Sequence, residues 1–316
     1  MKKVNICFLT DNGYAMPTGV AIESLCKNKK KNTKYDIYIL AIDISYENEK
    51  ILESMNSNNI SINIIKLKNK YKDFNMKNVS ATSAAMYKFQ IPDILSSQDK
   101  VIYLDGDIIV KSDLSELYSI DLGDNYIGAV LDINGVLKHH YNMYIKHNVF
   151  YFNSGVMLMN LKKMRKEKIS EKLIEYRLNG YNELMDQDAL NYILKGRTLE
   201  IPFKYNTQTM YTIINKDIKQ LKKVLKLPEK YEKCDDIINN SIILHYSLKG
   251  KPWKNNNTFM YDEWNYYYNI SPYKDKIKIK LDNNIIKKKN LCQKVSNLIK
   301  NYRRYRFLRN FIEARK

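Results

Sequence analysis

Two carboxylates stand two residues apart in the segment VIYLDGDIIV, residues 101–110. The apolar residues before them predict a strand, and side chains at positions i and i+2 of an extended chain point the same way. Asp105 and Asp107 can therefore approach one ion together, and Gly106 between them lets a ligand come close to the backbone. Two carboxylates at this spacing repel each other unless a cation lies between them. The pattern favours a divalent metal with free positions for phosphate oxygens, although Asp-Gly is also an ordinary turn signal.

A histidine is a second candidate ligand for this metal. His245 follows an apolar run that predicts a late strand over residues 237–244. An imidazole beside two carboxylates suits manganese better than a site made only of oxygens. A single histidine after a strand is more often structural, so position alone leaves both interpretations of His245 open.

The segments around the acidic pair predict strands and helices in alternation. We expect strands at 4–10, 35–42, 60–67, 100–104, 126–131 and 150–161, with 108–110 continuing the strand beyond the acidic pair. We expect helices at 16–28, 47–55, 83–95 (with Ser83 as N-cap), 169–179 and 188–194. This order favours an α/β fold with a mainly parallel central sheet and helices on both faces. Ligands of such sheets bind beyond the carboxyl ends of the strands, where the acidic pair would lie.

Length and composition limit the class of protein. A chain of 316 residues with 44% hydrophobic residues can bury one large α/β domain. The four cysteines match no zinc spacing and are expected to be free thiols. We find no apolar run of the ~18 residues that a membrane span needs, and no signal-peptide core. We therefore expect a cytoplasmic protein.

Positive charge is concentrated at the C-terminal end. Residues 274–316 contain 15 Lys/Arg and 3 Asp/Glu, so they carry +12 of the total charge of +19. We expect a catalytic domain over 1–271 and a basic helical tail over 272–316. Apolar residues recur at helical spacing over 291–312, which predicts an amphipathic helix that lies on an anionic membrane surface or packs on the domain. The basic charge is not spread over the domain and no nucleic-acid-binding motif is found, so we expect no nucleic-acid partner.

Six segments resemble, in order, those of the family 8 glycosyltransferases, which include glycogenin and the galactosyl- and glucosyltransferases of bacterial lipopolysaccharide synthesis. They are FLTDNGYA (8–15), AAMYKFQIPDIL (84–95), VIYLDGDIIV (101–110), FNSGVMLMNL (152–161), DQDALN (186–191) and HYSLKGKPW (245–253). The resemblance covers about residues 3–268. It implies a GT-A fold, a Mn²⁺ ion (or Mg²⁺ in its place), a UDP-sugar donor and transfer with retention of anomeric configuration.

The resemblance also implies which residues form the site. Asp105, Asp107 and His245 would bind the metal. Thr10, Asp11 and Tyr14 would line the uridine pocket, and Asp11 can accept a hydrogen bond from the uracil N–H while Tyr14 offers a stacking face. The residues that would meet the phosphates or the sugar are Lys88, Gly106, Asn153, Ser154, Gly155 and Lys251. Those that would lie near the anomeric carbon are Asp186 and Gln187.

Two positions depart from the family pattern in ways that affect the chemistry. Lys88 stands where many relatives have arginine; it keeps the charge but loses the planar two-pronged donor. Leu248 stands where relatives often have glycine, which puts the closure of the 247–251 loop in doubt. A third departure, Gly13 in place of asparagine, matters less.

The expected function is a retaining transfer of glucose or galactose from a UDP-sugar to a glycan or lipid-linked glycan, on the inner face of a membrane if the tail binds there. Because Gln187 is a poor nucleophile, attack of the acceptor on the face that the leaving group departs from is favoured over a covalent intermediate on Asp186. The loop 132–148, with His139, His140 and His147, is expected to be a lid or an acceptor contact. The alternatives are a sugar nucleotidyltransferase, for which no glycine-rich triphosphate loop is found, and a self-glycosylating glycogenin-like protein.

Overall fold

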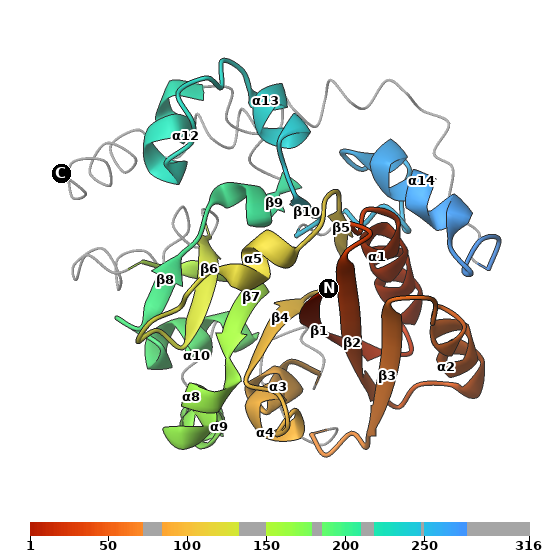
Figure 1. Cartoon of the computed structure of the whole chain (residues 1–316), viewed down its shortest axis with the longest axis vertical. Helices are drawn as coiled ribbons and strands as arrows, with labels where there is room; N and C mark the ends of the chain where they lie inside the picture. Colours follow the sequence, from red (N-terminus) through yellow and green to blue (C-terminus); the bar gives the residue numbers. More distant parts are fainter. Residues whose placement is uncertain (72–83, 133–149, 179–184, 210–217, 248–249, 277–316) are drawn as a thin grey trace.

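The computed structural model describes residues 1–71, 84–132, 150–178, 185–209, 218–247 and 250–276. A seven-stranded sheet in the order β3-β2-β1-β4-β7-β6-β8 lies at the centre of this part of the chain (Figure 1). Its strands are β1 (Lys2–Asp11), β2 (Thr33–Ile42), β3 (Ile60–Leu67), β4 (Lys100–Leu104), β6 (Ile127–Leu131), β7 (Phe152–Asn160) and β8 (Thr198–Glu200). The first four strands in this order are parallel, whereas β7 runs antiparallel to both of its neighbours. The predicted α/β class with a mainly parallel sheet is confirmed.

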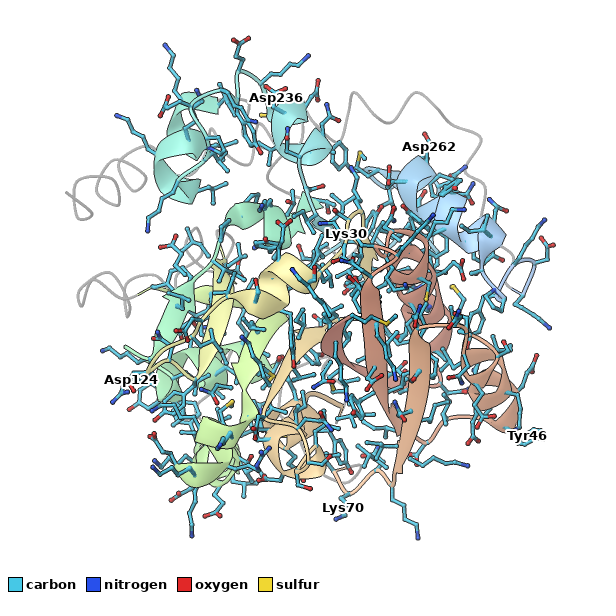
Figure 2. The ribbon with its side chains drawn as sticks, in the orientation of Figure 1. Lys30, Tyr46, Lys70, Asp124, Asp236 and Asp262 are labelled. Carbon is cyan, nitrogen blue, oxygen red and sulfur yellow. The ribbon has the colours of Figure 1, made fainter. Side chains whose placement is uncertain are left out.

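Helices cover both faces of this sheet. They are α1 (Ala15–Lys27), α2 (Tyr46–Glu53), α3 (Ala84–Phe89), α4 (Ile91–Ile94), α5 (Ser115–Ser119), α8 (Leu161–Lys166), α9 (Ile169–Leu178) and α10 (Met185–Ile193). Alternate residues of β1 belong to different cores: Ile6 and Phe8 pack with α1 and α5, and Cys7 packs with α3, α9 and α10. By contrast, Tyr46 at the start of α2 is 74% exposed and lies at the rim of the molecule, as Figure 2 shows.

A second, three-stranded sheet adjoins the first, in the order β5-β10-β9. Its strands are β5 (Ile108–Val110), β9 (Thr207–Gln208) and β10 (Ile243–His245). It lies in Figure 1 between the main sheet and the pair α12 (Ile218–Leu225) and α13 (Cys234–Asn239). The short helix η1 (Phe203–Tyr205) precedes β9, and α14 (Tyr261–Ile270) packs against α1.

The expectation that residues 108–110 continue the strand before the acidic pair is wrong. The last paired residue of β4 is Leu104, which faces Val156 of β7. Beyond Asp107 the chain leaves the main sheet, and Ile108 pairs with His245 of β10 instead. The acidic pair therefore lies where the chain passes from one sheet to the other.

Two other predicted elements differ in the structure. The expected strand over 237–244 begins as helix α13, whose first turn is fixed because the Asp236 carboxylate accepts hydrogen bonds from the backbone N–H groups of Glu232 and Lys233. Strand structure starts only at Ile243. The single helix expected over 83–95 is two helices, α3 and α4, with Pro92 in the first turn of the second.

Several expectations fall outside the described residues: Ser83 as a helix cap, the histidine-bearing loop, Leu248, and the tail from residue 277 on. The chain just beyond the expected domain boundary at residue 271 does belong to the core, because Tyr273 is 2% exposed and its ring lies against Gly19 of α1. Among the described residues, no helix has both the length and the apolar character to cross a membrane.

Candidate active site

The sheet topology brings three segments to one edge. β1 and β4 are parallel, so Thr10 and Asp11 lie at the same edge as Asp105. β7 runs the opposite way and therefore begins at this edge, which places residues 153–155 beside Asp105. The Asp105 backbone N–H donates to the Gly155 carbonyl oxygen at 2.8 Å.

Asp105, Asp107 and His245 meet at this edge. Each offers one ligand atom, and the three atoms lie within 4.8 Å of one another. His245 Nε2 lies 3.3 Å from Asp107 Oδ1 and 3.9 Å from Asp105 Oδ2. Two carboxylates with one imidazole are a donor set for manganese and other divalent first-row metals. The three residues that sequence reasoning chose as ligands are thus within reach of one ion.

The space beside these three side chains exists because residue 155 is glycine. A Cβ atom at Gly155 would lie 2.3 Å from His245 Cε1 and 2.8 Å from Asp105 Oδ2, far inside contact distance. Both ligands would have to move to admit a methyl group. The cluster and its glycine neighbour fit a bound divalent ion.

Replacing Gly155 with alanine is therefore expected to weaken Mn²⁺ binding at least tenfold, on the order of what displaced ligands cost, and to lower kcat with it. Electron paramagnetic resonance of a Mn²⁺ titration measures the affinity. Gly123→Ala is a control for glycine loss. Its positive φ makes an alanine there locally strained, but no neighbouring atom lies within 4 Å of the Cβ position, so no other side chain has to move. Unchanged Mn²⁺ affinity in the Gly155 variant would contradict this account of the site.

Gly106, between the two carboxylates, faces helix α1. A Cβ atom there would lie 2.5 Å from Thr18 Oγ1. The glycine therefore lets α1 pack closely against the acidic segment. This packing is a structural requirement for glycine, distinct from the ligand approach inferred from the sequence.

Two lysines neutralise the carboxylates. Lys251 Nζ lies 2.5 Å from Asp107 Oδ2 and donates to the Tyr246 carbonyl oxygen at 2.6 Å. Lys88 Nζ lies 2.5 Å from Asp186 Oδ2 and 3.4 Å from Asp105 Oδ1. Each carboxylate of the acidic pair thus has a lysine partner as well as access to the metal position.

These ion pairs govern protonation at the site. Burial alone would raise the pKa of Asp107, but His245 and Lys251 outweigh it and hold that pKa far below its ordinary value. Burial alone would lower the pKa of Lys88, but Asp105 and Asp186 outweigh it and raise that pKa. Asp107 is therefore ionised and Lys88 charged at neutral pH.

Asp186 and Gln187 lie in the first turn of α10 and face the start of β7. Asp186 Oδ2 accepts a hydrogen bond from Ser154 Oγ at 2.9 Å in addition to its ion pair with Lys88. The Gln187 amide oxygen accepts from the Ser154 backbone N–H at 3.1 Å and from Asn153 Nδ2 at 3.3 Å. The structure thus joins both candidate catalytic residues to the segment expected to meet the sugar.

The candidate uridine residues lie at the end of β1. Thr10 is buried and Asp11 Oδ1 accepts a hydrogen bond from the Tyr14 backbone N–H at 2.9 Å. The Tyr14 ring meets Trp253 edge-on, with ring centres 5.7 Å apart. Burial, together with the nearby charges of Asp107 and Asp105, raises the pKa of Tyr14 to about 12. Tyr14 therefore stays neutral near the acidic pair.

Sequence reasoning missed four residues of this site. Tyr103 donates to Asp105 Oδ1 at 2.6 Å. It stands two residues before Asp105 in extended chain, so the same alternation that puts Asp105 and Asp107 on one side would have identified Tyr103 as well. Asp132 accepts from Gln187 Nε2 at 2.6 Å, and Tyr151 lies 3.2 Å from the same nitrogen. Asn206 contacts His245, and no local pattern identifies it.

A mostly parallel α/β sheet with two carboxylates and an imidazole at its edge is the arrangement expected of a GT-A-type glycosyltransferase. The chain belongs to glycosyl transferase family 8, whose family model matches residues 5–257.

Among curated relatives, General stress protein A of Bacillus subtilis is 28% identical over 276 residues, covering 84% of this chain and 92% of the relative. A lipopolysaccharide 1,2-glucosyltransferase of Escherichia coli K12 is 28% identical over 281 residues, covering 86% and 76%. Among solved structures, the galactosyltransferase LgtC in complex with donor and acceptor sugar analogues matches with a TM-score of 0.68 at 23% identity, covering 85% of this chain and 96% of that one. This likeness confirms the fold.

Proposed function

We propose that this family 8 glycosyltransferase is a Mn²⁺-dependent retaining hexosyltransferase that moves glucose or galactose from a UDP-sugar to a glycan or lipid-linked glycan. The observation that carries the proposal is the arrangement of one candidate metal cluster, Asp105, Asp107 and His245, between two lysines. Three metal ligands with cations on either side suit a diphosphate whose charge grows as its bond to the sugar breaks.

The residues around the cluster have distinct parts in this proposal. A bound divalent ion would supply positive charge to the diphosphate leaving group. Lys251, now paired with Asp107, has the reach of a flexible side chain and would turn to the same diphosphate. Asp11 and Tyr14 would hold the uracil. Lys88 would hold Asp186 and Ser154 in place against the sugar.

Contacts of the two candidate catalytic residues favour attack on the face that the leaving group departs from. Asp186 is engaged by Lys88 and by Ser154, which lowers its readiness to form a bond to the anomeric carbon. Gln187 is anchored at both ends of its amide and carries no charge. Neither is a well-placed nucleophile, so the departing phosphate is proposed to take the proton of the acceptor hydroxyl.

Known relatives guide the choice of acceptor. The E. coli relative acts, by its name, in lipopolysaccharide glucosylation, and the LgtC structure contains donor and acceptor sugar analogues. We carry a glycan or glycolipid acceptor over to this chain as part of the proposal.

The test is a UDP-release assay across UDP-glucose, UDP-galactose and UDP-N-acetylglucosamine, each with Mn²⁺, Mg²⁺ or EDTA. Release is expected with one of the two UDP-hexoses and Mn²⁺, and loss is expected in EDTA. Release that is equal in EDTA would refute the metal requirement. Release of inorganic diphosphate from UTP and a sugar phosphate would indicate the nucleotidyltransferase alternative, and a rise in intact mass would indicate self-glycosylation.

The basic tail is proposed to bring the enzyme to an anionic membrane, since each basic residue near such a surface adds ~1 kcal/mol. We expect the full chain to sediment with phosphatidylglycerol vesicles at low salt and not with phosphatidylcholine vesicles. A variant that ends at Lys276 keeps Tyr273 in the core and is expected to stay in solution. Equal sedimentation of this shorter variant would contradict the role of the tail.

A further inference from the structure

A row of side-chain amides connects the metal cluster to the residues near the sugar. It consists of Asn206, Asn153 and Gln187 and ends at the Asp132 carboxylate; we call it the amide network. Asn206 is fully buried, and Asn153, at 8% exposed, and Asp132, at 4% exposed, are buried as well. Five hydrogen bonds join its members to one another and to His245, one of them a direct bond of 3.4 Å from Asn153 Nδ2 to Asp132 Oδ2.

The network begins at the candidate metal ligand. His245 Nδ1 lies 2.9 Å from Asn206 Oδ1. An amide oxygen only accepts, so this contact requires a proton on Nδ1 and leaves Nε2 as the ring nitrogen that faces Asp105 and Asp107. Nε2 is the nitrogen that lies 3.3 Å from Asp107. Asn206 thereby selects the ring form that binds a metal through Nε2.

The orientation of each amide is fixed by partners that only donate or only accept. The Gly155 backbone N–H donates to Asn153 Oδ1 at 3.0 Å, so that atom is the amide oxygen. Asn206 Nδ2 donates to the same oxygen at 2.8 Å, which turns Asn206 Oδ1 toward His245. A reversal of any one amide would set two donors or two acceptors against each other.

The far half of the network follows the same logic. Asn153 Nδ2 donates to Gln187 Oε1 at 3.3 Å, and the Ser154 backbone N–H donates to that oxygen as well. Gln187 Nε2 donates to Asp132 Oδ2 at 2.6 Å, and the carboxylate can only accept. All three amides therefore point the same way, from His245 to Asp132.

We infer that Asn206 is a positioning residue that holds His245 ready for the metal and, through Asn153, aligns Gln187 with the same centre. This inference rests on the proposed metal-dependent transfer. It assigns one side chain two separable tasks: its oxygen serves His245, and its nitrogen serves the sugar side of the site.

Two substitutions separate these tasks. Asn206→Asp keeps an acceptor for His245 Nδ1 but replaces the donor to Asn153 with a second acceptor, which forces the network to break beyond it. We expect Mn²⁺ affinity within about threefold of the wild type and kcat lowered about tenfold or more. Asn206→Leu removes both groups, and we expect Mn²⁺ affinity to fall about 10- to 100-fold.

Asn5→Asp is the matched control. Asn5 is 7% exposed and its Nδ2 donates to three acceptors, Gln98 Oε1, the Lys100 carbonyl oxygen and the Tyr118 hydroxyl oxygen, but it lies away from the active site. The same change there is expected to lower the melting temperature and leave Mn²⁺ affinity and kcat as in the wild type.

Affinity is measured by electron paramagnetic resonance of Mn²⁺ titrations without donor, and kcat by UDP release. A wild type that binds no Mn²⁺ would defeat the proposed function itself. Wild-type binding together with unchanged affinity in both Asn206 variants would overturn only this inference. Equal loss of affinity in Asn206→Asp and Asn206→Leu would also overturn it, because the retained acceptor would then have no effect. If Asn206→Leu does not fold, the split between affinity and kcat in Asn206→Asp decides the matter.

Discussion

Asp107→Asn is expected to lower kcat/KM by about a thousandfold or more while the protein remains folded. The change removes a charged ligand from the candidate metal cluster and keeps the shape of the side chain. Lys251 and His245, which hold the Asp107 pKa down, lose the negative charge that they face, so both the candidate metal position and the neighbouring lysine are disturbed. Thermal unfolding is expected to shift by only a few degrees, because His245 still faces Asp105 and Lys251 still donates to the Tyr246 carbonyl oxygen.

Asp113→Asn serves as the matched control. Asp113 is 4% exposed, like Asp107, but its carboxylate accepts hydrogen bonds from the backbone N–H groups of Lys30 and Ser115 on the far side of the domain. Its replacement is expected to cost about 1–3 kcal/mol of stability and to change kcat/KM less than twofold, about the scatter of a kinetic comparison. An active Asp107→Asn enzyme with Mn²⁺ present would refute the assignment of the metal cluster.

Lys88→Met is expected to lower both stability and activity. Lys88 is 5% exposed and forms ion pairs with Asp186 and Asp105, so its removal takes the ion-pair partner from the buried Asp186 carboxylate. Breaking a buried pair in this way costs about 3–5 kcal/mol. The loss of Asp186 and Ser154 alignment is expected to lower kcat/KM about a hundredfold or more.

The double variant Lys88→Met with Asp186→Asn separates the two effects. It removes the charge that the single variant leaves unpaired and is expected to recover a large part of the lost stability, with no recovery of activity. If the stability losses of the two single variants simply add in the double variant, Lys88 and Asp186 do not interact energetically.

The pH dependence of this stability difference follows from the sign of the Lys88 pKa shift. The pKa is raised in the folded protein, so the contribution of Lys88 is fully present below the unfolded value of about 10.4 and is lost as pH rises through the folded value. Chemical denaturation at a series of pH values should show a constant difference between wild type and Lys88→Met near neutrality and a smaller one only in strong alkali. A difference that disappears below pH 8 would contradict the direction of the shift.

Much of the fold could be predicted because the signals are local. The apolar runs of β1, β2, β3 and β4 were placed correctly from their length and the polar residues that end them. The acidic pair was found because two carboxylates after a strand are a pattern within three residues. The structure also places His245, 138 residues after Asp107 in the numbering, within reach of the same ion.

Other features depend on contacts that local sequence does not contain. Ile237 and Ile238 are apolar and adjacent, which suits a strand, but the cap formed by Asp236 starts a helix instead. Ile108 has the residue type of a continuing strand, yet it pairs with β10, which follows more than a hundred residues later. Asn206 is an ordinary polar residue until the fold sets it beside His245.

The passage of the chain from one sheet to the other at residues 105–107 has a mechanical consequence. Asp105 is tied to the large sheet through its bond to Gly155, whereas His245 is the last residue of a strand in the small sheet. An ion or ligand that binds both side chains therefore also links the two sheets. Binding at this site should therefore reduce the motion of one sheet relative to the other.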